Sequence, residues 1–231
     1  MTRFLTALIM LLGALTVLAQ DFATTVKSTE VAPGILLIEG ADGFAGGNIT
    51  LLTGEDRIAL IDNPADAGSI GGLPIVTFDD AVTFHINGLD AHVFHVEQAH
   101  TDGDAVIEFQ GANVLHAGDV FFNFLFPFID LDNGGSVAGF IAAQQKIIAM
   151  SDDETIIIPG HGPLASKSDL QTALDVLIDC EARVTALVDD GKTAEEVVAA
   201  NPLADYHDTW NWSFITTERM TQTLYRSLTS N

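Results

Sequence analysis

The chain has 231 residues, of which 48% are hydrophobic, and its mean hydropathy is +0.30. This composition suits one globular domain with a sizeable core and excludes an intrinsically disordered chain. The chain has nine Lys and Arg residues and 32 Asp and Glu residues, which gives a formal net charge of −23. Nucleic-acid binding is therefore excluded, because it requires clusters of Lys and Arg.

The N-terminus has the pattern of an export signal. Arg3 supplies a positive charge, residues 4–18 are almost wholly apolar, and Val17-Leu18-Ala19 places small or aliphatic side chains before a cleavage site. The apolar run is shorter than the roughly 20 residues that a transmembrane helix needs. We therefore expect a signal peptide over residues 1–19, a single mature domain over residues 20–231, and a periplasmic or secreted product without a membrane span. An uncleaved anchor is the alternative.

Short strands are expected along most of the chain after the leader. Apolar and β-branched runs alternate with Gly-rich or polar turns, and Asn87-Gly88 is typical of a tight hairpin. The predicted strands are Ile35–Glu39, Asn48–Thr53, Ile58–Asp62, Pro74–Phe78, Val82–Ile86, Ala91–Val96, Ala105–Phe109, Asn113–His116 and Thr155–Ile158.

Helical periodicity dominates the last third of the chain. The predicted helices are Ser136–Met150, Ser168–Asp190, Thr193–Ala200 and Thr216–Leu228. Cys180, the only cysteine, falls in the second of these as a packed thiol, and an intrachain disulfide is excluded. Strands that lead into helices through short loops predict a layered α/β sandwich in one domain.

Residues suited to metal binding follow three of the predicted strands. His100 lies in the turn Gln98-Ala-His-Thr-Asp-Gly-Asp104, Asp119 ends His116-Ala-Gly-Asp119, and His161 lies in Pro159-Gly-His161-Gly162. Imidazole and carboxylate are zinc ligands, and the glycines let the backbone come close to such a centre. A single histidine in a loop is usually solvated or hydrogen-bonded. The three junctions together predict a shared metal site.

The other histidines fit this site less well. His92 and His95 are three apart on a strand, so their side chains point to opposite faces and do not chelate one ion. We expect His85 to face solvent or a polar layer, His116 to support the ligands from behind, and His207 to be structural.

Several motifs together resemble the metallo-β-lactamase superfamily over nearly the whole mature chain. They are Val31-Ala-Pro-Gly-Ile35, Gly46-Gly-Asn48, Leu60-Ile-Asp62, the stretch from Gly71-Gly-Leu-Pro74 to His161-Gly162, and the C-terminal Trp210-Asn-Trp212 and Tyr225-Arg226. The resemblance implies an αββα sandwich. It also implies that His100 is the third histidine of a first zinc site, that Asp119 bridges two zinc ions, and that His161 is the final histidine of the second site. Aspartate rather than cysteine at the bridging position resembles the glyoxalase-II-like branch.

One motif of that family is missing. No His-x-His-x-Asp-His sequence occurs, and the chain passes almost directly from Asn63 to Gly71, as if an internal segment were deleted near residues 66–72. The sandwich is therefore expected to be incomplete in its N-terminal half. In the family, the missing loop supplies the other ligands and the acid/base aspartate. His100, Asp119 and His161 would hold one zinc ion at most, where the family uses two.

Two functions are consistent with this sequence. The first is an exported, zinc-dependent hydrolase of a small-molecule ester, lactone, thioester or amide, impaired by the loss of half of its metal site. The second is a non-catalytic relative, a pseudo-enzyme that keeps the scaffold as a binding module. No catalytic residue is assigned. The Phe-rich stretch from Phe121 to Phe128 is interpreted as core, with a loop over an apolar substrate pocket as the alternative.

Overall fold

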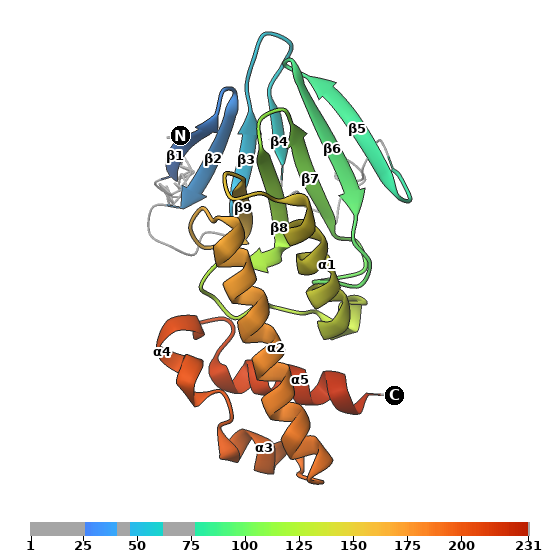
Figure 1. Cartoon of the computed structure of the whole chain (residues 1–231), viewed down its shortest axis with the longest axis vertical. Coiled ribbons are helices and arrows are strands. Elements are labelled where there is room, and N and C mark those ends of the chain that lie inside the picture. The colour runs from blue at the N-terminus through green and yellow to red at the C-terminus, as the bar shows by residue number, and fades with distance from the viewer. Residues whose placement is uncertain (1–25, 41–46, 62–76, 231) are drawn as a thin grey trace, which may run out of the picture.

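Two β-sheets form the upper part of the molecule (Figure 1). The structure is a computed structural model, and it describes residues 26–40, 47–61 and 77–230. Sheet A is antiparallel and consists of β1 (Val26–Ala32), β2 (Ile35–Gly40), β3 (Ile49–Leu52) and β4 (Ala59–Ile61). Sheet B consists of β5 (Ala81–Ile86), β6 (Leu89–His95), β7 (Ala105–Gln110), β8 (Val114–Phe122) and β9 (Ile156–His161). All of its neighbouring strands are antiparallel except β8 and β9, which are parallel.

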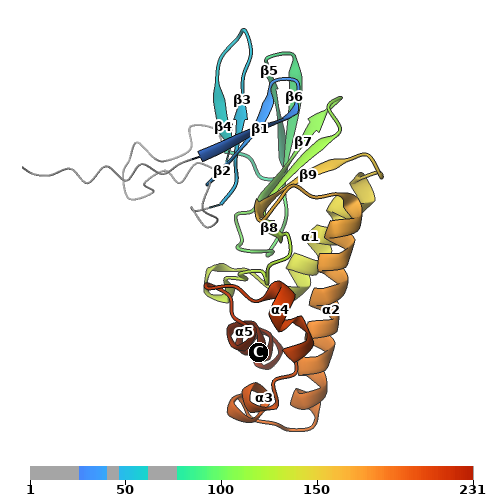
Figure 2. The same cartoon turned by 90° about the vertical axis from the view of Figure 1, so that its left-hand side faces the viewer.

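The helices lie on one side of sheet B and below both sheets (Figures 1 and 2). They are α1 (Val137–Met150), α2 (Lys167–Asp189), α3 (Ala194–Ala200), α4 (His207–Trp210) and α5 (Thr217–Thr229), with the short 3-10 helices η2 (Leu131–Asn133) and η3 (Ala204–Tyr206). Helices α1 and α2 pack on β8, and the second half of α2 packs against α3 and α5. The second helix is long enough to connect the sheets with the C-terminal helices.

β8 is buried on both faces along most of its length, and this explains its largely apolar sequence. Leu115 packs into the core shared with the helices, whereas its neighbour Val114 packs with Ile158 into the core between the two sheets. Cys180 is fully buried in the helical core, as expected, and burial raises the pKa of its thiol to about 12.

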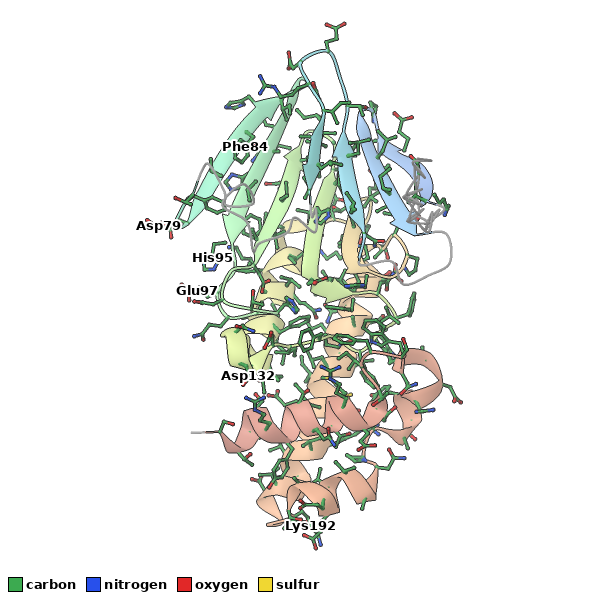
Figure 3. All side chains as sticks on the ribbon, turned by 180° about the vertical axis from the view of Figure 1, so that it is seen from behind. Asp79, Phe84, His95, Glu97, Asp132 and Lys192 are labelled. Atoms are coloured by element: carbon green, nitrogen blue, oxygen red, sulfur yellow. The ribbon has the colours of Figure 1, made fainter. Side chains whose placement is uncertain are left out.

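The described residues of the N-terminal half form strands and contribute no helical layer. Within residues 26–40, 47–61 and 77–136, the structure contains no α-helix, so the predicted incomplete αββα sandwich is confirmed. β4 is one edge of sheet A and β5 is one edge of sheet B, and apolar side chains at these edges are exposed: Ile58 by 69%, Leu60 by 55% and Phe84 by 43%. Figure 3 shows Phe84 on the outer edge of sheet B. A cavity of about 760 Å³ opens between these two edges, far from the predicted metal ligands.

Most of the predicted strands and helices are confirmed, but two strands run further than the sequence indicated. β8 continues to Phe122 and β9 to His161, so Asp119 and His161 lie within strands and not in turns after them. The glycine at 118 suggested a turn, yet it adopts a φ of +54° in an irregularity of a continuing strand. β1 was not predicted.

Some predictions fall outside the described residues. These are the leader over residues 1–19, the deletion near residues 66–72, and most of the predicted strand Pro74–Phe78. The two described residues of that range, Thr77 and Phe78, do not form a strand. In the described part of the chain, no helix combines the length and hydropathy required to cross a bilayer.

Asn48 connects the two sheets at the end of β9. Its backbone N–H donates to the Gly160 carbonyl at 2.7 Å, and its side-chain amide donates to the carbonyls of Pro159 and Gly162 at 2.8 and 2.9 Å. Asn48 is 6% exposed, so these bonds are shielded from water. The start of β3 is thereby fixed against the strand end that carries His161.

We predict that Asn48→Ala lowers the free energy of unfolding by about 2–3 kcal/mol, because it leaves two buried carbonyls without their donor. Urea unfolding measures this change. Asn133→Ala is the matched control: its amide bonds only the exposed Asp130, and a loss below about 1 kcal/mol is expected. Equal losses in the two variants would contradict the role assigned to Asn48.

Candidate metal centre

The turn that carries His100 is packed against the start of α1. The Ser136 hydroxyl and N–H both donate to the Gln98 carbonyl at 2.9 Å. Glycines at 135 and 139 make this close approach possible: a Cβ at Gly135 would lie 2.3 Å from the His100 carbonyl oxygen, and one at Gly139 would lie 2.1 Å from that of Gln98. The helix N-terminus therefore fixes the position of the histidine.

Asp119 and His161 come from the two parallel strands of sheet B. Gly118 is in register with Pro159, and Phe122 with His161. A Cβ at Gly160 would lie 2.2 Å from Asp119 Oδ1, so only glycine leaves room for the carboxylate at this position.

The three predicted ligands converge on one carboxylate. His161 Nε2 lies 3.3 Å from Asp119 Oδ1, and His100 Nε2 lies 3.7 Å from Asp119 Oδ2. Two ligand atoms of a tetrahedral zinc ion lie about 3.4 Å apart, since each is about 2.0–2.1 Å from the metal. Both distances are close to that separation. The two imidazoles nevertheless approach opposite oxygens of Asp119. Within the described residues, no group of three or more His, Cys, Asp and Glu side chains is gathered as a complete metal site.

The tautomer of His100 suits a metal ligand. Its Nδ1 lies 2.7 Å from the Phe128 carbonyl oxygen, which only accepts hydrogen bonds, so Nδ1 carries the proton. In the neutral ring, the lone pair of Nε2 then faces the carboxylate of Asp119. Two electron-rich atoms that face each other need a cation between them, either a second proton or a metal ion.

Asp119 has an unsatisfied oxygen at the centre of the group. Its Oδ1 is buried and has no assigned hydrogen-bond partner in the described part of the chain, and Nε2 of His161 lies 3.3 Å from it. Burial would by itself raise the pKa of this carboxyl, but His161 and the nearby His100 outweigh it and lower the pKa below its usual value. An ionised, incompletely bonded carboxylate between two imidazoles is a suitable environment for a cation.

His116 lies behind Asp119, as the sequence predicted for a supporting residue. It is 2% exposed, and burial lowers its pKa to about 4 although the charge of Asp119 acts in the opposite direction. Its Nδ1 accepts from the Gly118 N–H at 3.1 Å, so the neutral ring carries its proton on Nε2, a buried atom without a partner in the described residues. The imidazole thus holds the irregular backbone directly before Asp119.

The remaining histidines have separate partners. His92 is hydrogen-bonded to Thr83, and His95 is hydrogen-bonded to the Asp102 carbonyl. His92 and His95 therefore do not form a pair. His85 is largely exposed and contacts Asp90. His207 bonds Thr217 in the helical part of the chain. None of these contacts brings them to the group around Asp119.

Aromatic residues form one wall of the site, and this is the main feature that the sequence did not assign. Phe122 stacks on His161 with a centroid distance of 4.8 Å, and Trp212 lies 5.8 Å from the same ring. His161 and Trp212 also line a cavity of about 460 Å³, together with Leu125 and Asn48. The Phe-rich stretch therefore serves two purposes: Phe121 and Phe126 are core residues, whereas Phe122 and Phe128 flank the histidines.

We predict that Gly160→Ala lowers the free energy of unfolding by about 1–3 kcal/mol, because the new methyl group collides with Asp119 and with the Gly118 backbone. Thermal and urea unfolding measure this. In the control Gly103→Ala, the added Cβ has its nearest neighbour at 3.9 Å, and little change is expected. A Gly160→Ala protein as stable as the wild type would show that the strands are not this close.

The buried His116 predicts a pH dependence of stability. The unfolded chain binds a proton there below about pH 6.5, but the folded chain does so only near pH 4. Stability therefore falls as pH drops from 6.5 towards 4, and between pH 7 and pH 5 this group accounts for about 2 kcal/mol. Urea unfolding at both pH values should show a smaller loss in His116→Leu than in the wild type. Identical losses would refute this assignment.

Comparisons with known proteins bear on the fold. Residues 64–161 match the model of the Metallo-beta-lactamase superfamily. No curated protein matches the chain. Among solved structures, a metallo-beta-lactamase from Pontibacter korlensis is similar with a TM-score of 0.55 and 14% identity, covering 67% of this chain and 100% of that one.

Another similar structure is the stereoselective inverting sec-alkylsulfatase Pisa1 from Pseudomonas sp., with a TM-score of 0.64 and 12% identity. The match covers 87% of this chain and 50% of Pisa1, so the chain spans about half the length of that enzyme. At these identities the likeness establishes the fold alone. The chain is a metallo-β-lactamase-fold protein that carries the sequence pattern of the Metallo-beta-lactamase superfamily over residues 64–161.

Proposed function

We propose that this chain is an exported zinc-dependent hydrolase that acts on a small molecule with an ester, lactone, thioester or amide bond. The observation that carries the proposal is the carboxylate of Asp119, which lies between the Nε2 atoms of His100 and His161 and whose Oδ1 has no hydrogen bond among the described residues. His100, Asp119 and His161 would hold one zinc ion. Because the imidazoles approach opposite oxygens, binding requires the ion to draw them together on one carboxylate.

Each residue of the group has a separate task in such a reaction. Bound zinc supplies the Lewis acidity that activates water and polarises a carbonyl at neutral pH. His100 is held in the ligating tautomer by the Phe128 carbonyl, and His116 fixes the backbone before Asp119. Phe122 and Trp212 exclude water from one side of His161. The 460 Å³ cavity beside His161 is of a size that suits a small substrate.

The second candidate is a non-catalytic binding module of the same fold. It is favoured by the absence of a complete three-ligand group among the described residues, and by the missing His-x-His-x-Asp-His motif. The superfamily scaffold and its cavity would then bind a ligand without converting it.

Zinc content and turnover separate these two functions. We expect the wild-type protein to bind one zinc ion, and His161→Ala to weaken zinc binding by roughly 100-fold or more, since an imidazole ligand is lost. Elemental analysis after dialysis and zinc titration calorimetry measure this. The matched control is His85→Ala, which removes an exposed histidine paired with Asp90 and should bind zinc as the wild type does.

The same proteins are then assayed on a panel of neutral esters, lactones, thioesters and amides, with and without a chelator. Zinc binding with chelator-sensitive turnover that is lost in His161→Ala is the expected result. Zinc binding without turnover would identify a binding module. A wild-type protein that binds no zinc would overturn the proposal.

A further inference from the structure

Six aromatic rings form a closed circuit beside the carboxylate of Asp119. Neighbouring centroids are 4.8 to 6.4 Å apart, within the range of favourable ring contacts. In order around the circuit, the rings are those of His100, Phe128, Phe214, Trp212, His161 and Phe122. The two ligand histidines thus belong to an apolar wall, and Phe214, which is 40% exposed, opens this wall to solvent.

Arg219 in the first turn of α5 lies over the outer part of this circuit. Its guanidinium carbon is 4.4 Å from the ring centroid of Phe214 and 5.3 Å from that of Phe128. Its Nη1 donates a hydrogen bond to the Phe214 carbonyl oxygen, and the two atoms are 3.0 Å apart. Cation–π contact and this bond hold the planar group in a fixed orientation. Phe128 is the one ring between Arg219 and His100.

The charge of Arg219 is not neutralised by a carboxylate. Within the described residues Arg219 makes no ion pair, whereas Arg183 pairs with Asp179 and Asp205, and Arg226 pairs with Asp132. This is unexpected in a chain with 32 acidic and nine basic residues. The donors of Arg219 other than the bonded Nη1 have no acceptor in the same part of the chain, so the Nε–Nη2 edge is available for a bidentate bond to a carboxylate.

Arg219 lines a small cavity of about 310 Å³. Phe128, Arg219 and Thr223 line it together with Asp130 and Asp132. The two aspartates are already used: Asp130 accepts from the backbone of η2, and Asp132 pairs with Arg226. Figure 3 shows Asp132 where the sheets meet the C-terminal helices. Arg219 is therefore the arginine of this cavity that has no ion-pair partner among the described residues.

From this arrangement we infer that Arg219 and the aromatic circuit form a specificity site for a carboxylate carried on an apolar, planar group. The carboxylate binds the Nε–Nη2 edge of Arg219, and the apolar part lies on Phe128 and Phe214, one ring away from His100. Because it concerns the substrate of the proposed hydrolase, this inference rests on that proposed function. It narrows the substrate class to esters or amides that also carry a free carboxylate.

Ligand binding tests the inference without any need for turnover. The chain has two tryptophans, and Trp212 belongs to the circuit, so intrinsic fluorescence reports on the site. The full-length protein is titrated with phenylacetate and with its neutral isostere phenylacetamide. We expect the carboxylate to bind at least about tenfold more tightly, as for a charge-assisted bidentate bond.

Three variants assign the preference to one residue. Arg219→Gln should abolish the difference between the two ligands, and Arg219→Lys, which keeps the charge but not the planar fork, should retain part of it. Arg183→Gln is the matched control, because that arginine pairs with Asp179 and Asp205 and does not line this cavity, and it should keep the wild-type preference. Thermal unfolding confirms that each variant is folded. A preference that persists in Arg219→Gln, equal binding of the two ligands, or no response to either would overturn the inference.

Zinc binding and hydrolysis of neutral esters are measured on the same Arg219→Gln protein. If zinc binding and turnover are present but the carboxylate preference is absent, only this inference fails. If the preference is present in a protein that binds no zinc, the hydrolase proposal fails and a carboxylate-binding site remains.

Discussion

The parallel pairing of β8 with β9 is the constraint on which the candidate site depends. It places Asp119 and His161 next to each other from segments that are far apart in the sequence, and a glycine at 160 leaves room for the carboxylate between the strands. Asn48 then fixes sheet A to the end of β9 through three buried hydrogen bonds. The side chain and N–H of Asn48 satisfy the carbonyls of this junction, and Asp119 Oδ1 has no hydrogen bond among the described residues.

The carboxylate of Asp119 explains how the residues around it are arranged. A buried anion is costly unless it is paired, and the two imidazoles that approach it are themselves held by a backbone carbonyl and by ring stacking. The rings that hold the histidines continue to Phe214, which Arg219 covers, so the candidate metal ligands and the inferred carboxylate site share one aromatic wall. Catalytic and binding residues on such a wall would be positioned by packing and not by mobile loops.

Periodicity and turn chemistry were sufficient to predict most strands and helices, because local signals such as Asn87-Gly88 and the capping box at Thr193 act within a few residues. Predictions from these local signals failed where a glycine has a role other than forming a turn. Gly118 and Gly160 resemble turn residues in sequence, but they allow continuing strands to bend and to come close together. The positions of Asp119 and His161 within strands followed from tertiary pairing, which no local pattern reports.

The sequence by itself determined the fold family, the three residue types that converge, and the absence of the loop that normally completes their metal site. Those features depend on residue identity and order. Only the tertiary structure decided that His100 and His161 meet opposite oxygens of Asp119, that Asn48 joins the sheets there, and that α5 places Arg219 one ring away from His100. Distances between side chains from different elements depend on how β8, β9 and α5 pack together, and packing is a property of the whole chain.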